Sequence, residues 1–140
     1  MKMPCTALAC VAFALALPAH GQDKACPKGE AQRAEKAIER VVNWQQLHKA
    51  FQDYAHCDQG AIDDLYTDTM LRLMVEWRNV EGLAGPVQSD AKYKAFIQRH
   101  LLSPMAKPDH PSLYSRAKAS CPAGLEAFCA ELAELVKPIQ

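Results

Sequence analysis

Several kinds of sequence feature are missing from this chain, and each absence narrows the class of protein. The formal net charge is zero, with 16 basic and 16 acidic residues, so no basic surface for nucleic acid is expected. Beyond the N-terminus, no apolar run approaches the roughly 20 residues needed to cross a bilayer. No segment alternates polar and apolar residues for long enough to form a strand. We therefore expect neither nucleic acid nor, after processing, a membrane as a partner.

The sequence patterns of common catalytic and metal sites are also missing. There is no G-x-S-x-G, no H-E-x-x-H and no glycine-rich phosphate loop, and no C-x-x-C-H for haem attachment. The compact C-x2-C and H-x3-H ligand pairs of structural zinc are absent, as is the ligand order of a calcium loop. We expect no catalytic residue, no metal and no cofactor, and hence a protein that is not an enzyme.

The N-terminus has the features of an export signal. Lys2 supplies a positive start, and Ala7–Leu17 is an unbroken apolar run of signal-peptide length. Small residues occupy the −3 and −1 positions if cleavage follows Gly21. The sequence predicts a signal peptide over residues 1–21 and a single domain over residues 22–140. The mature protein is expected in the periplasm or secreted.

Apolar residues recur at three- and four-residue steps through most of the mature chain, which is typical of amphipathic helices. The pattern predicts an all-α fold, a small bundle of about five helices with two disulfides. The expected helices are about Glu30–Ala55, a second from near Asp58 to the glycine-rich segment at 81–86, Asp90–Leu102, Leu113–Ser120 and Leu125–Val136.

Four cysteines remain after signal cleavage, namely Cys26, Cys57, Cys121 and Cys129. In an oxidising compartment an even number predicts two disulfides. An unbroken first helix of about 25 residues is roughly 37 Å long, whereas bonded cysteines have Cα atoms within about 7 Å. This length excludes Cys26–Cys57, and with it Cys121–Cys129, unless the helix breaks. We prefer Cys26–Cys129 with Cys57–Cys121 over the exchanged pairing.

The stretch HCDQGAIDDLYTD, His56–Asp68, carries a histidine, a cysteine and four aspartates. A helix junction explains it, because a histidine is favourable at a helix C-terminus and aspartates are favourable at the next N-terminus. Asp58 would then be the N-cap of the second helix. The alternative is a small metal-dependent hydrolase that uses the cluster His56, Asp63, Asp64 and Asp68.

The second helix has apolar residues on two sides. Leu71 and Val75 fall nearly opposite its main apolar stripe and share that far face with Asp64 and Asp68. Such a helix either lies between two layers of a bundle or offers one side to a partner. We expect these four residues to bind another protein.

The two motifs HCDQGAIDDLYTD and CPAGLEAFC resemble those of a family of small exported bacterial helical proteins of unassigned activity, with the pattern HCDxGAI…Y…D and CPAGL…C. Size, export and two disulfides are loosely similar to periplasmic immunity proteins that neutralise secreted antibacterial effectors. The resemblance implies a non-enzymatic protein-binding module and transfers no residue role. Besides the hydrolase, a carrier of an apolar ligand between helices is the remaining alternative.

Overall fold

The computed structural model describes residues 24–138, and the signal peptide predicted over residues 1–21 lies outside them. Within the described residues the chain forms α-helices and two short 3-10 turns, without a strand, which confirms the all-α class. No helix in this part of the chain is both long and apolar enough to cross a membrane. The elements are α1 (Lys28–Glu39), α2 (Trp44–Tyr54), η1 (Ala55–Cys57), α3 (Ala61–Glu76), α4 (Glu81–Ser89), α5 (Ala91–Leu101), η2 (Lys107–Asp109), α6 (His110–Ala119) and α7 (Glu126–Leu135).

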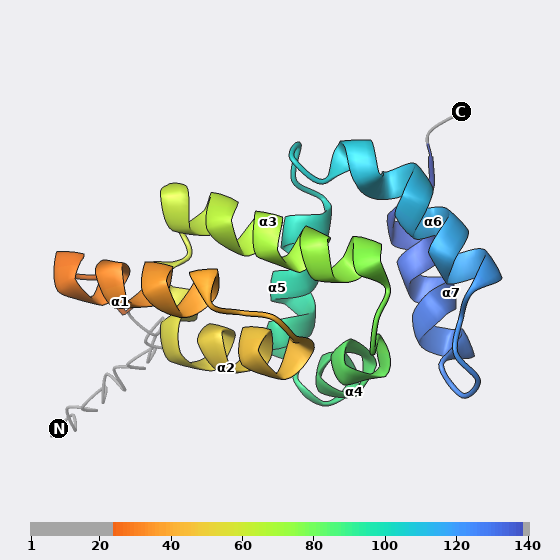
Figure 1. The fold of residues 1–140 in the computed structure, drawn as a ribbon, viewed down its shortest axis with the longest axis horizontal. Helices are drawn as coiled ribbons and strands as arrows, with labels where there is room; N and C mark the ends of the chain where they lie inside the picture. Colours follow the sequence, from red (N-terminus) through yellow and green to blue (C-terminus); the bar gives the residue numbers. More distant parts are fainter. Residues whose placement is uncertain (1–23, 139–140) are drawn as a thin grey trace, which may run out of the picture.

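The helices pack around a continuous apolar core (Figure 1). α1 and α2 run antiparallel at one end, and α3 crosses the middle of the molecule in contact with α1 and α5. α4 packs against α2 and α5, and the α6–α7 hairpin forms the opposite end. α3 contributes more buried side chains than any other helix described, seven of its 16 residues. It is the central helix of the bundle.

The prediction of one long first helix is wrong, because the chain reverses between α1 and α2. α1 ends at Glu39 and α2 begins at Trp44. The side chain of Asn43 accepts a hydrogen bond from the amide of Gln46 at 2.9 Å, and the Gln46 side chain accepts one from the amide of Val42. This reciprocal arrangement is close to a capping box, which satisfies amide groups that a new helix N-terminus leaves free. The single long helix predicted for this segment is therefore a helical hairpin of α1 and α2.

Both predicted disulfide pairings are wrong for the same reason. The hairpin returns the chain to its start, so Cys26 bonds Cys57 with their Cα atoms 5.0 Å apart. Cys121 bonds Cys129 within the turn that joins α6 to α7. The expectation that all four cysteines form two disulfides is confirmed. Each bridge, however, closes a local unit instead of joining the two ends of the molecule.

A second difference from the sequence prediction is α4. The glycines and the proline at 82–86 predict the end of the second helix, but the structure has a further helix there. The helix forms because Leu83, Ala84 and Val87 are buried. Gly82 allows α4 to approach α2 closely, since a Cβ atom there would lie 3.4 Å from the Cβ of Trp44. Tertiary burial therefore outweighs the weak helix propensity of these residues.

The two disulfides should differ in their contribution to stability. The cysteines of the first are 31 residues apart and those of the second 8, which corresponds to about 3.7 and about 2.5 kcal/mol in the chain-entropy description. We expect the double variant C26S/C57S to lose more free energy of unfolding in urea than C121S/C129S. Non-reducing peptide mapping checks the pairing directly. A fragment that joins Cys57 to Cys121 or to Cys129 would overturn the assignment.

Candidate functional site

The structure brings together a cluster of polar side chains from three parts of the chain, here called the Asp58 cluster. Its members are Asp58 after η1, Asp63 and Thr67 on α3, and Arg99 and His100 on α5. Asp58 reaches α5 because Cys57, the residue before it, is held by the disulfide to Cys26. The α1–α2 hairpin therefore positions a carboxylate against a helix that follows about 40 residues later in the chain.

Within the Asp58 cluster the imidazole of His100 lies between a hydroxyl and a carboxylate. Its Nδ1 is 2.6 Å from Oγ1 of Thr67, and its Nε2 is 3.1 Å from Oδ2 of Asp58. The Arg99 guanidinium binds the same Asp58 oxygen and, at 2.6 Å, Oδ1 of Asp63. His100 is completely buried, and the Asp58 side chain is only 5% exposed. The cluster thus joins the residue after η1 to α3 and α5, through the buried His100 and the exposed Arg99.

A hydroxyl, an imidazole and a carboxylate in line are the components of nucleophilic catalysis. Here the hydroxyl of Thr67 donates to the backbone carbonyl of Asp63 at 3.0 Å. The same oxygen lies 2.6 Å from Nδ1 of His100, and the imidazole is completely buried, so neither group is accessible to a substrate. Thr67 is also only 1% exposed. The geometry favours a structural role for this set of residues.

The same residues offer three ligand atoms within 4.8 Å of one another, from Asp58, Asp63 and His100. Oxygen and imidazole ligands suit several divalent metals. The positive charge that these carboxylates face in the structure is the Arg99 guanidinium, which contacts both of them. A metal ion would have to displace Arg99, so this donor set fits an arginine side chain better than a metal ion.

The cluster that the sequence suggested for a metal-dependent hydrolase is not brought together. His56 lies 3.0 Å from Glu30 of α1, and Asp64 and Asp68 are exposed on α3. Of that set only Asp63 belongs to the Asp58 cluster. Asp58 does not cap α3, since Gly60, with φ of 56°, occupies the cap position. His100 could not be assigned to this cluster from the sequence, because its partners become neighbours only in the folded chain.

The surface predicted to bind a partner is only partly open. Asp64 and Asp68 are exposed, Val75 is half-buried and Leu71 is 7% exposed. Beside them the connection between α5 and α6 adds a further wall, and a shallow hollow of about 340 Å³ results. We call it the α3 hollow; its lining residues are Asp68, Leu71, Arg72, Val75, Met105 and Asp109.

Three histidine–carboxylate pairs connect segments that are distant in sequence: His48 with Asp90, His56 with Glu30, and His100 with Asp58. Asp90 also caps α5. The hydrogen bond that the Tyr93 amide donates lowers the pKa of the Asp90 carboxyl below its usual 3.8, and the contact with His48 is the next largest cause. The Lys24 ammonium, with a smaller contribution from His56, lowers the pKa of Glu30 below its usual 4.5. Both carboxylates therefore stabilise the fold in their ionised form.

Replacing Thr67 by valine tests the structural role of the Asp58 cluster. The substitution keeps the shape but leaves Nδ1 of His100 buried without its hydrogen-bond partner, which should cost about 1–3 kcal/mol of unfolding free energy. Thr69 provides the control, because it is buried on the same helix and no side-chain hydrogen bond of it is found within residues 24–138. We expect Thr69→Val to cost clearly less in urea denaturation. Equal effects of the two substitutions would contradict the role assigned to Thr67.

The lowered pKa values predict how stability depends on pH. Each carboxyl has a lower pKa in the folded than in the unfolded chain, so its contribution is present above the usual value and is lost as the pH falls through the folded value. Asp90→Asn keeps a capping side chain and removes the charge. Below about pH 4, we expect the melting temperature of this variant to fall less steeply with decreasing pH than that of the wild type. The exposed Glu76→Gln serves as control, and an unchanged slope in Asp90→Asn would contradict the prediction.

Comparison with known proteins adds no relative to this description. No protein-family model, no curated protein and no solved structure matches the chain significantly. The resemblance to small exported bacterial proteins therefore remains a prediction from the two motifs. The function has to be argued from the geometry of the chain itself.

Proposed function

We propose that this protein is an exported, non-enzymatic module that binds another protein through the α3 hollow. An immunity-type protein that neutralises a secreted effector is one form such a module takes. The observation that carries the proposal is the hollow itself, about 340 Å³ in volume, with exposed carboxylates beside apolar side chains. Partner surfaces commonly combine an apolar centre with a polar rim.

The apolar part of the α3 hollow comes from both of its walls. Val75 and the nearly covered Leu71 lie on α3, and Met105, which is 43% exposed, lies on the connection to α6. Leu102, another of the few large apolar side chains that are exposed, is three residues before Met105. Methionine is suited to such a surface because its flexible side chain adapts to different partners.

The rim of the α3 hollow is mainly acidic. Asp68 and Asp109 line it, and Asp64 is exposed one turn before Asp68 on the same face of α3. Arg72 is the basic residue of the lining, and its guanidinium is partly occupied by a 2.8 Å hydrogen bond to the carbonyl of Val41. The partner surface best matched to these charges carries lysine or arginine beside an apolar side chain.

Two further observations support export and a binding role. The cysteines of the described residues are bonded in two disulfides, as is usual in oxidising compartments. The hydroxyl–imidazole–carboxylate set, the arrangement closest to a catalytic site, has its hydroxyl and imidazole buried. A disulfide-bonded helical scaffold with an exposed acidic hollow suits recognition of a pre-formed protein surface.

Charge reversal in the α3 hollow tests the proposal. A non-reducing pull-down from periplasmic extract should recover a partner with the wild type and lose it with D64K/D68K, because rim charges mainly speed association with a basic surface. Met105→Asp should also weaken binding, by placing a charge against the apolar centre of the contact.

The matched control is E35K/E39K, which reverses two exposed charges on α1. It should retain the partner, and all variants should keep a melting temperature close to that of the wild type, because the replaced side chains are exposed. Retention of the partner by D64K/D68K and Met105→Asp alike would remove the α3 hollow as the contact.

A further inference from the structure

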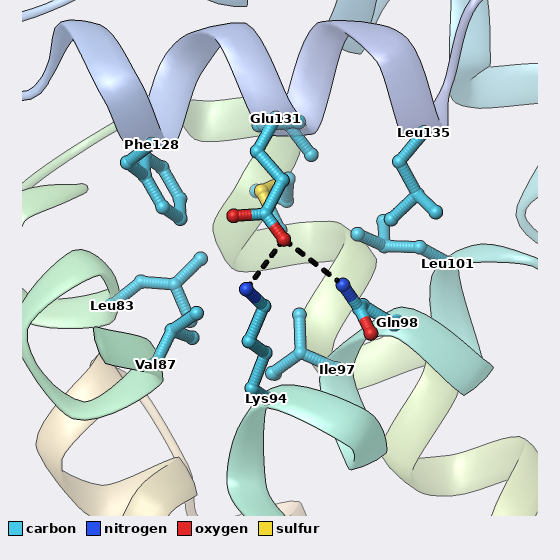
Figure 2. Close-up of a pocket in the computed structure, with 11 residues that line it drawn as sticks. Leu83, Val87, Lys94, Ile97, Gln98, Leu101, Phe128, Glu131 and Leu135 are labelled. Carbon is cyan, nitrogen blue, oxygen red and sulfur yellow. Dashed lines mark hydrogen bonds and ion pairs between the residues drawn. The ribbon is translucent and has the colours of Figure 1, made fainter. Parts of the chain in front are cut away.

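A narrow apolar cavity separates α7 from the body of the bundle. α4 contributes Leu83 and Val87, α5 contributes Ile97 and Leu101, and α7 contributes Phe128 and Leu132. Figure 2 shows Phe128 of α7 facing the side chains from α4 and α5 across this cavity. The volume is about 30 Å³, enough for a group of one or two heavy atoms. We call this cavity the α7 slot.

The mouth of the α7 slot is closed by polar side chains. Glu131 extends from α7, and its Oε1 accepts from Lys94 Nζ at 2.5 Å and from Gln98 Nε2 at 3.2 Å (Figure 2). Both donors belong to α5, one turn apart. A single carboxylate oxygen therefore connects α7 to the donors that stand at the entrance of an apolar cavity.

α7 is well placed to move away from this cavity. Its backbone packs chiefly on α6, and the disulfide Cys121–Cys129 lies inside the α6–α7 hairpin. Neither disulfide links the hairpin to the rest of the chain. Outward movement of α7 breaks the Glu131 contacts and separates the walls of the α7 slot. No covalent cross-link opposes this movement.

We propose that the α7 slot is a binding site for a single-chain amphiphile with an anionic head group. The alkyl chain enters between α5 and α7 as α7 moves outward, and the head group replaces the Glu131 carboxylate on Lys94 and Gln98. An anion is specified because Glu131 leaves with α7, whereas both donors stay on α5. A carboxylate or a phosphate monoester satisfies the same two donors, and both head groups are carried by natural single-chain lipids.

This site is separate from the α3 hollow, and its test does not depend on the protein partner. The full mature protein, with both disulfides intact, is titrated below the critical micelle concentration with dodecanoate and with dodecyltrimethylammonium, which has the same chain length and the opposite charge. We expect saturable binding of one dodecanoate, at least tenfold tighter than the cation. Acetate, which has the head group alone, should not bind, and lysophosphatidic acid distinguishes a phosphate head group from a carboxylate.

Two variants should change the affinity in opposite directions. Lys94→Met removes the cation and should weaken dodecanoate binding about tenfold. Glu131→Gln removes the competing carboxylate and should strengthen binding several-fold. Lys92→Met, an exposed lysine on α5 that does not line the α7 slot, should leave the affinity unchanged. A Glu131 that only stabilised the fold would lower the melting temperature when replaced without tightening dodecanoate binding.

Non-saturable uptake, or equal affinity of the wild type, Lys94→Met and Lys92→Met, would overturn the proposal, because either result indicates general surfactant adsorption. Preference for dodecyltrimethylammonium would overturn it as well, since the donors on α5 would then not be the head-group site. Chemical shift changes at Ile97 and Leu132, with none at Leu71, would place the bound chain between α5 and α7.

Discussion

The turn at Val41–Asn43 determines the path of the remaining chain. Two β-branched residues followed by a capping asparagine end one helix and begin another. The reversal returns the chain to Cys26, so that a disulfide can form with Cys57. Through the neighbouring residue the same bridge fixes Asp58 against α5, where it meets His100 and Arg99. A short local signal therefore controls one covalent link and one buried polar contact.

The Asp58 cluster shows why chemical composition alone is a weak guide to activity. It contains a hydroxyl, an imidazole and paired carboxylates, yet the hydroxyl of Thr67 and the imidazole of His100 are both buried. Arg99 binds both of the carboxylates that a metal ion would need. Buried polar groups are costly to leave unpaired; Oδ2 of Asp58 is paired, whereas its Oδ1 has no hydrogen-bond partner among the described residues. The value of these groups here is that they fix η1, α3 and α5 in one arrangement.

Helical periodicity was sufficient to predict the fold class and the positions of most helices. It failed at two places where a local signal competed with a longer pattern. The apolar stripe continues across Val41 although Asn43 and Gln46 form a capping pair, and α4 forms despite Gly82 and Pro86 because its apolar side is buried. The Asp58 cluster could not be predicted, because Asp58 and His100 are brought together only by the hairpin and its disulfide.

The disulfide pattern also determines which parts of the molecule can move independently. Had Cys26 and Cys57 bonded Cys121 and Cys129, the α6–α7 hairpin would have been tied covalently to the first helices. With both bridges local, the hairpin is held by side-chain contacts. They include the Glu131 bonds to α5, the apolar walls of the α7 slot, the bond from Trp77 Nε1 to the Ser120 carbonyl at 2.8 Å and the contact of His110 Nε2 with the Leu101 carbonyl at 2.7 Å. Contacts of this kind open at a much lower free energy than global unfolding requires. The break in the first helix is therefore also the reason why no disulfide ties α7 to the earlier helices.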